Sequence, residues 1–347
     1  QNPQTGKLLT RRMKTTRWDA DKMQTVANRR IFYDFTFSPP KSVSIQALAA
    51  DDRRLLDAHQ RAVQIAVKEL ELFAGTRIRR KDEWSERLTG NIVCATFQHD
   101  TSRALDPHLH THCVLFNATF DAVENRWKAL SNYEMLLARK YAENVYYHEY
   151  ARELRRCGYE IENTHRGDFE IVGVSRELQS RFSKRHNQID ASLEKLLKEK
   201  PELANGNLKE LRSQIAQNER SRKIEGIALP ELQRLWDSQL TSDERQSLRK
   251  LANQPKKITP SLSPLDAAQS PADAIRWGEA HLFDRRSVVR ENELWGAALE
   301  RGRGFDYSTQ DIKAMAGARD YLRNKEAPLK ITMREILSRE WDIVCLA

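Results

Sequence analysis

The chain has 347 residues, a mass of 40.3 kDa and a formal net charge of +9, from 58 Lys or Arg against 49 Asp or Glu. This length predicts two domains, or one large domain with an appendage. No apolar run reaches the roughly 18 residues that a membrane-spanning helix needs, which excludes a transmembrane protein.

The N-terminus and the cysteines indicate the cellular compartment of the protein. The N-terminus has no apolar stretch, so no signal peptide is predicted, and it lacks a starting Met, which indicates a piece of a longer protein. The four cysteines show no CxxC spacing, which argues against a zinc ribbon or a disulfide framework. Such cysteine usage fits a reducing compartment, and we expect a cytoplasmic protein.

The basic excess lies mostly at the beginning of the chain. Residues 1–50 carry nine Lys or Arg against three Asp or Glu. This excess has two interpretations: a mobile, solubilising terminus, or a basic arm that binds a nucleic-acid backbone through its phosphates. The residues expected to form this arm are Arg11, Arg12, Lys14 and Arg17.

Residue patterns up to Gly158 predict alternating strands and helices. In chain order the predicted elements are a strand over 31–37, a second short strand over 42–46 (SVSIQ), a helix capped by Asp51 that runs to about Ala74, strands over 90–98 and 110–119, and a long helix over 131–157 closed by Gly158. The apolar face of the first helix is predicted to comprise Leu56, Val63, Val67, Leu70 and Phe73.

After Gly158 the pattern becomes mainly helical. A hairpin is predicted from residues 159–163 and 169–174, followed by a helix beginning at Ser175 and charged helices over 187–251. The stretch 253–271 holds four prolines and is predicted to be a linker. The expected domains are therefore 1–252, a linker over 253–271, and a helical segment over 272–347. Because strands and helices alternate irregularly, we expect the α+β class.

Four histidines fall within fourteen residues, from His99 to His112. Side chains two apart on a strand share a face, so His110 and His112 point the same way. His99 ends the preceding strand, and an antiparallel return brings it to the same face. Three neutral imidazoles leave coordination positions open, as in a catalytic metal site. The alternative is that they are ordinary core histidines. His108 precedes the strand, so we expect it to be exposed or to lie behind the ligands.

Two long motifs resemble those of the MobF-type conjugative relaxases, members of the HUH endonuclease superfamily. They are HDTSRALDPHLHTHCVLFNAT over 99–119 and YDFTFSPPKSVSIQAL over 33–48. The resemblance continues through WKALSN, which begins at Trp127, and covers roughly residues 2–190. It implies an antiparallel, palm-like HUH sheet flanked by helices.

The resemblance implies a single-strand DNA transesterase that nicks and rejoins plasmid DNA at a transfer origin. His99, His110 and His112 match the three metal ligands of the family, and Asp34 matches its acidic residue. Asp34 is expected either to orient a ligand imidazole or to help take the proton of the attacking tyrosine. The resemblance favours Mg²⁺ or Mn²⁺, while the ligand types also suit Zn²⁺ or Ni²⁺. Implied partners are relaxosome accessory proteins and a type IV secretion coupling protein.

Two cations near these motifs are weaker candidates. Arg103 is expected to contact the scissile or a neighbouring phosphate, and Lys41 to steer DNA. Each has the alternative interpretation of a solvated surface charge. The family's nucleophilic tyrosine is expected upstream of Gln1. Tyr146 and Tyr150 share a helix face and are expected to pack against the sheet instead of attacking DNA.

The segment over 272–323 is similar to the helical lead-in of a helicase. No GxxxxGK[ST] motif is present, so we predict no ATP hydrolysis by this chain. Two alternatives to the nicking enzyme remain at this point: a single-stranded DNA-binding module without cleavage activity, and an unrelated metallohydrolase that acts on a small substrate.

Overall fold

The computed structural model describes residues 16–19, 23–27, 30–80, 83–165, 167–219, 226–253, 270–324 and 329–346. Helices and antiparallel strands are mixed along the chain, as the α+β prediction requires. The strands are β1 Thr16–Asp19, β2 Gln24–Ala27, β3 Phe32–Phe37, β4 Gly75–Arg80, β5 Glu83–Leu88, β6 Cys94–Thr101, β7 Pro107–Phe116, β8 Thr119–Asp121, β9 Arg126–Lys128, β10 Ile161–Asn163, β11 Phe169–Ile171, β12 Val289–Arg290, β13 Tyr321–Arg323 and β14 Lys330–Met333.

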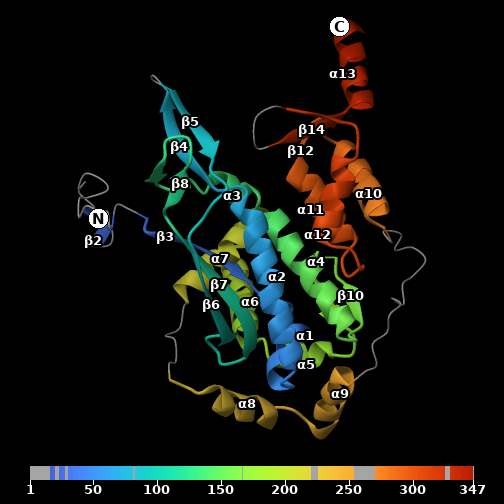
Figure 1. Cartoon of the computed structure of the whole chain (residues 1–347). Helices are drawn as coiled ribbons and strands as arrows, with labels where there is room; N and C mark the ends of the chain where they lie inside the picture. The colour runs from blue at the N-terminus through green and yellow to red at the C-terminus, as the bar shows by residue number, and fades with distance from the viewer. Residues whose placement is uncertain are drawn as a thin grey trace.

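The helices include two long ones that cross the centre of the molecule, α2 and α4 (Figure 1). Their bounds are α1 Lys41–Ser44, the π-helix η1 Ile45–Ala49, α2 Arg53–Glu71, α3 Tyr133–Leu137, α4 Arg139–Arg156, α5 Arg176–Arg181, α6 Lys184–Glu199, the 3₁₀-helix η2 Pro201–Asn205, α7 Leu208–Asn218, α8 Leu229–Ser238, α9 Ser242–Ala252, α10 Pro271–Phe283, α11 Glu291–Arg301, α12 Thr309–Gly317 and α13 Arg334–Leu346.

The central sheet has the strand order β3-β7-β6, and both pairings are antiparallel. Burial alternates along β7, so one face of this middle strand is covered and the other is partly open. Helices α2 and α4 lie on the covered face, where the Phe37 ring contacts the Tyr146 ring of α4 at 5.4 Å between centroids. The open face carries the histidines of β6 and β7 together with Asp34 and Thr36 of β3. All three strands were predicted from alternation, with bounds shifted by up to four residues.

Helix α2 begins one residue later than predicted. Asp52 is its N-cap, because the Asp52 carboxylate accepts a hydrogen bond from the Arg54 amide; Asp51 was the wrong choice. The buried face also differs, since it centres on Leu55, His59 and Val63, whereas Leu56 and Val67 are only half-buried. The predicted apolar stripe was therefore rotated relative to the face that packs on the sheet.

The prediction of a strand over 42–46 was wrong. These residues form α1 and the start of η1, and all five are buried. Ser42 is held from outside its own helix, since its hydroxyl accepts a hydrogen bond from the Ile171 amide at 2.9 Å. The Gln46 side chain donates to the Leu248 carbonyl at 2.9 Å. These long-range contacts outweigh the strand preference of the Val and Ile in the segment.

The single helix predicted over 131–157 is two helices, α3 and α4, which meet at Ala138. The glycine after α4 and the hairpin that follows it are as predicted. Gly158 follows α4 with φ of +99°, where a glycine relieves the strain of a left-handed residue. Strands β10 and β11 form the predicted hairpin, and Ser175 caps α5 through its hydroxyl. Three further antiparallel pairs lie outside the central sheet: β1–β2, β4–β5 and β8–β9.

The C-terminal part contains the predicted helices α10, α11 and α12, and in addition a three-stranded sheet of order β12-β14-β13 that was not predicted. Helix α11 packs on α4 (Figure 1). Asn144 of α4 donates to the Gly296 carbonyl at 2.9 Å, and a Cβ at Gly296 would lie 3.5 Å from the Tyr141 Cα. The division at 253–271 stays a prediction, and most of that stretch lies outside the described residues.

Across the described ranges, every helix is too short or too polar to cross a membrane.

Candidate metal centre

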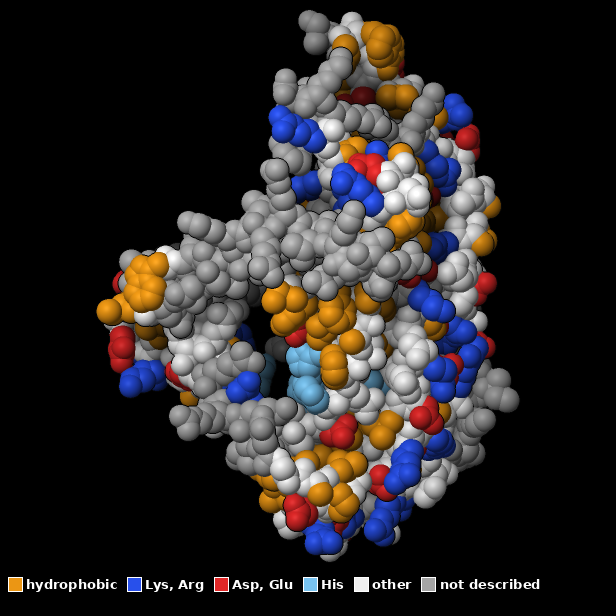
Figure 2. Space-filling model, turned by 60° about the vertical axis from the view of Figure 1, so that its left-hand side comes forward, with side chains coloured by type: hydrophobic (Ala, Val, Ile, Leu, Met, Phe, Trp, Pro, Cys, Tyr) orange, Lys and Arg blue, Asp and Glu red, His pale blue; other side chains and the backbone are white. Residues whose placement is uncertain are grey.

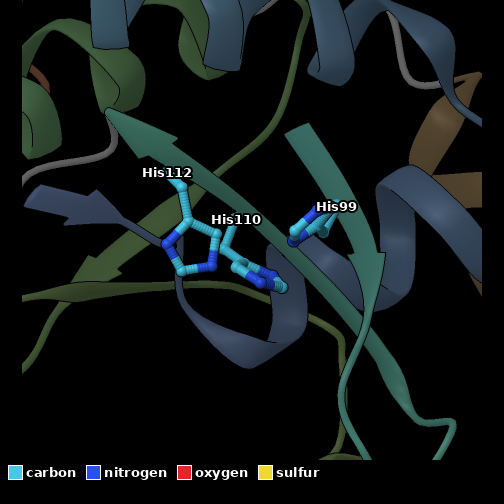
Figure 3. A group of neighbouring side chains, drawn as sticks. All are labelled: His99, His110 and His112. Atoms are coloured by element: carbon cyan, nitrogen blue, oxygen red, sulfur yellow. The ribbon is translucent and has the colours of Figure 1, made fainter. Parts of the chain in front are cut away.

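Three histidines meet on the open face of the central sheet. His99 of β6 is paired directly with His110 of β7, and His112 follows two residues along the same strand. One ring nitrogen of each histidine lies within 4.8 Å of the others. The rings converge from two neighbouring strands (Figure 3), with centroids 5.1–5.2 Å apart. Metal–nitrogen bonds of about 2.0–2.1 Å place two ligand nitrogens at most about 4.2 Å apart, so small ring rotations would bring these three nitrogens onto one cation.

Asp34 fixes the orientation of one of these rings. Its Oδ2 lies 2.8 Å from His112 Nδ1, and Thr36 Oγ1 lies 3.0 Å from the same nitrogen. β3 supplies both side chains because Thr36 is paired with His112 across the sheet. A hydrogen bond from Nδ1 to the carboxylate leaves the Nε2 lone pair of His112 free for a metal. This contact supports the orienting role expected for Asp34, and its role in taking the tyrosine proton stays a prediction.

A backbone carbonyl orients the second ring. His110 Nδ1 lies 2.9 Å from the His108 carbonyl oxygen, so this nitrogen carries the proton and Nε2 is unprotonated. Burial lowers the pKa of His110, and the neighbouring His112 and His99 lower it further. Both effects keep the imidazole neutral, which is the form that binds metals.

His108 lies beside the three histidines and is half-buried. Its ring stacks on His110 with centroids 4.6 Å apart. Burial lowers the pKa of His108 to about 3, and the nearby His110 and Lys41 lower it as well. His108 therefore supports the ring of His110 and is neutral. The ring of His108 thus lies beside the three histidines and is not an exposed side chain.

Arg103 lies in the turn between β6 and β7 and is half-buried. Neighbouring helices hold this turn in place. The Trp236 indole donates to the Leu105 carbonyl at 2.7 Å, and buried Asp106 accepts from the Lys184 amide at 2.8 Å. Ser102 completes the turn by accepting hydrogen bonds from two of its backbone amides. The turn that carries Arg103 is thus fixed next to the histidine strands.

Lys41 lies at the first position of α1 and is half-buried. Its Nζ donates to the Pro107 carbonyl at 2.9 Å, which places the ammonium group at the beginning of β7. Burial lowers the pKa of Lys41 to about 8, although Asp106 and Glu170 oppose the shift. The structure therefore brings Lys41 next to His108 at the histidine end of the sheet.

The structure does not describe the side chains of the predicted basic arm. Arg11, Arg12 and Lys14 lie outside the described residues, and so does the side chain of Arg17, whose backbone belongs to β1.

Tyr146 and Tyr150 are buried on the covered side of the sheet, with 1% and 0% of their surface exposed. The Tyr146 hydroxyl lies 2.8 Å from His59 Nδ1, and Tyr150 donates to the Leu55 carbonyl at 2.9 Å. Burial raises the pKa of both phenols well above the ordinary value. The Tyr146 ring packs α4 against the central sheet through Phe37, as predicted. The Tyr150 ring instead packs α4 against α2 and against Phe169 of β11.

Open space adjoins Asp34. A cavity of about 730 Å³ runs along β3 and α4, and its walls include Asp34, Thr36 and Arg139 as well as the buried ring of Tyr146. The side chain of Asp34 is 41% exposed and that of His112 31%, so a ligand can reach both. Figure 2 shows histidine side chains at the surface of one face, beside a group of hydrophobic side chains.

Sequence reasoning missed two groups that support the site. Thr36 shares the open face with Asp34, and strand alternation alone would have placed it there. His59 lies on α2, and its ring contacts Thr111, the residue between His110 and His112 in the sequence. Its only signal in the sequence is its spacing, four residues after Leu55 and four before Val63.

Comparison with known proteins agrees with this geometry. Residues 1–242 match the TrwC relaxase family. The chain is 41% identical over 192 residues to the multifunctional conjugation protein TraI of Escherichia coli, an alignment that covers 50% of this chain and 11% of TraI. TraI of E. coli strain K12 is also 41% identical, over 168 residues, covering 45% of this chain and 9% of that protein. The chain thus spans about a tenth of the length of these curated relatives.

Solved structures of the conjugative relaxase TrwC with oriT DNA share the fold. A metal-bound complex is 34% identical with a TM-score of 0.55, covering 64% of this chain and 73% of the TrwC chain in that structure. A copper-bound complex is 33% identical with the same TM-score, covering 66% and 73%. Family match, shared α+β fold and motif residues agree with one another, and this chain belongs to the TrwC relaxase family.

Proposed function

We propose that this chain is the DNA-processing part of a conjugative relaxase, which binds single-stranded DNA at a plasmid transfer origin, nicks one phosphodiester and rejoins it. The observation that carries the proposal is the convergence of His99, His110 and His112 beside Asp34, in a chain of the TrwC relaxase family. TrwC itself has been seen in complex with oriT DNA.

The three histidines would hold a divalent cation through their unprotonated ring nitrogens. Two of these nitrogens are selected by hydrogen bonds, from His112 Nδ1 to Asp34 and from His110 Nδ1 to the His108 carbonyl. When bound, the cation would polarise the scissile phosphate and stabilise charge on its non-bridging oxygens. Phosphate chemistry favours Mg²⁺ or Mn²⁺, while Zn²⁺ and Ni²⁺ also suit imidazole ligands, and one TrwC complex is copper-bound.

Two cations would assist from the chain itself. Arg103, in the fixed turn between β6 and β7, would present a planar guanidinium to the scissile or a neighbouring phosphate. Lys41, at the beginning of β7, would attract the DNA backbone. The basic residues Arg11, Arg12, Lys14 and Arg17 would extend this positive surface along the strand.

The attacking hydroxyl is proposed to come from a tyrosine upstream of Gln1. Tyr146 and Tyr150 are unsuited to the task because they are buried on the opposite side of the sheet and have raised pKa values. This observation favours the second candidate function for the chain by itself, a module that binds metal and single-stranded DNA without cleaving it. We place the reaction in the bacterial cytoplasm, with relaxosome accessory proteins and a type IV coupling protein as partners.

The test is covalent-adduct formation on labelled oligonucleotides that carry candidate transfer origins, with and without the natural segment that precedes Gln1. We expect a protein–DNA adduct only when that segment is present, and its loss on chelation or in a His110→Ala variant. The matched control is His281→Ala, in which an exposed histidine of α10 is removed. Adduct formation that survives both chelation and His110→Ala would contradict the proposal.

A further inference from the structure

A hydrogen-bonded chain of three buried side chains lies directly beneath the histidine strand. His59 Nε2 is 2.8 Å from Thr111 Oγ1, and His59 Nδ1 is 2.8 Å from the Tyr146 hydroxyl. The chain links α2, β7 and α4, three elements that are far apart in sequence. His59 is fully buried, and Thr111 and Tyr146 are 5% and 1% exposed.

Thr111 connects the hydrogen-bonded side chains to the candidate metal centre. Thr111 lies between His110 and His112, and its side chain points to the covered face while theirs point to the open face. It is also central in the sheet, since it pairs with Phe37 of β3 and Gln98 of β6. A constraint on the Thr111 side chain therefore acts on the backbone of two metal-ligating residues at once.

The three side chains can satisfy all hydrogen bonds of the His59 ring. Burial lowers the pKa of His59 to about 3, so the ring is neutral, with one donating and one accepting nitrogen. Both nitrogens have a partner in either tautomer, because a threonine and a tyrosine hydroxyl each donate or accept. Apolar side chains would fill this space without the penalty of burying polar groups, but they would hold β7 less specifically.

We propose that His59 is a positioning residue for the metal centre. Through its hydrogen bond to Thr111, His59 holds β7 so that His110 and His112 face His99. This inference rests on the proposed metal site and goes beyond it, because it assigns a role to residues that touch neither metal nor DNA. Tyr146 of α4 contributes indirectly, because its hydroxyl holds the ring of His59.

The test measures metal affinity and geometry in the full 347-residue chain. Mn²⁺ binding is followed by electron paramagnetic resonance, and the Co²⁺ absorption spectrum reports ligand geometry. The variants are His59→Leu, Thr111→Val and Tyr146→Phe, each of which removes a member of the chain at nearly constant volume. Tyr150→Phe is the matched control, because it removes one buried hydroxyl from the same helix, bonded to Leu55 instead of the chain.

We expect Mn²⁺ affinity to fall about 10-fold in His59→Leu and Thr111→Val, the range seen for partners that orient metal ligands, with a changed Co²⁺ spectrum. Tyr146→Phe should lose less than about 10-fold, because it leaves the contact between His59 and Thr111 in place, and Tyr150→Phe should lose nothing. A double variant that combines His59→Leu with Thr111→Val should lose no more Mn²⁺ affinity than either single variant, because both substitutions break the same contact. Should His59→Leu fail to fold, Thr111→Val carries the test alone.

Unchanged Mn²⁺ affinity in folded Thr111→Val would overturn the positioning role, as would an equal loss in Tyr150→Phe. If the unmodified chain itself bound neither Mn²⁺ nor Co²⁺, the metal centre of the proposed function would fail instead. The two failures are thus distinguishable by the behaviour of the unmodified protein.

Discussion

Asp34 and His112 lie 78 residues apart in the sequence and 2.8 Å apart in space, joined by a hydrogen bond between Oδ2 and Nδ1. Antiparallel pairing of β3 with β7 brings them together, and Thr36 reinforces the contact from the position opposite His112. Their hydrogen bond links the family's acidic motif to its histidine motif in one chemical unit. It fixes which nitrogen of His112 faces the other two histidines.

The contact predicts graded effects of two substitutions at Asp34. Asp34→Asn keeps an acceptor for the His112 Nδ1 proton but loses the charge, whereas Asp34→Ala loses both. We expect divalent-metal affinity to fall by about 10-fold in the first and by up to about 100-fold in the second. Titration with Mn²⁺ would check this order. Thr36→Val, which removes the weaker partner, serves as the control, and a larger loss there than in Asp34→Ala would contradict our assignment.

Lys41 predicts a pH dependence of DNA binding. Burial lowers its pKa to about 8, so the side chain is positive below that pH and becomes neutral above it. Single-strand affinity should therefore decline as the pH rises from 7 to 9. Lys41→Arg should remove this decline, because a guanidinium stays charged throughout the range. Fluorescence anisotropy with a labelled oligonucleotide measures both proteins, and an identical pH profile in the variant would count against a DNA contact by Lys41.

The basic arm predicts a salt effect. Each phosphate contact on single-stranded nucleic acid contributes about 0.7 to the slope of log affinity against log salt concentration. Replacing Arg11, Arg12, Lys14 and Arg17 together by Ala should therefore flatten that slope by up to about 3. Affinities measured between roughly 50 and 200 mM salt give the slope. An unchanged slope would make these residues a solubilising terminus.

His148 predicts that the fold is weakened by acid. It is fully buried, its Nε2 lies 2.7 Å from the Tyr307 carbonyl, and burial lowers its pKa to about 4. An unfolded histidine titrates near 6.5, so the unfolded state takes up the proton first and stability falls as the pH drops below that value. The loss is about 1.4 kcal/mol per pH unit, or about 2 kcal/mol at pH 5.

His148→Gln keeps a donor for the Tyr307 carbonyl but cannot be protonated. The drop in Tm between pH 7 and pH 5 should therefore be smaller in this variant than in the unmodified chain, with chelator present to remove any metal contribution. Equal drops in both proteins would show that His148 does not contribute to acid sensitivity.

Features that depend on short-range periodicity could be predicted from local sequence patterns. Alternation of side chains placed His110 and His112 on one strand face, and the turn before them brought His99 to the same face. The α+β class and helices α4, α10, α11 and α12 likewise followed from local patterns. Each of these features depends on only a few neighbouring residues, so local patterns were sufficient to predict it.

Contacts between distant segments could not be predicted in this way, because they form only when the chain is folded. The residues of SVSIQ are helical because Ser42 and Gln46 find partners in β11 and α9, beyond any local window. The sheet of β12, β13 and β14 was not predicted because its strands are only two to four residues long. The bond between Asp34 and His112, and that between His59 and Thr111, depend on strand register and helix packing. Such contacts decide which ring nitrogen is free and how firmly a strand is held, and local propensity carries no information about either.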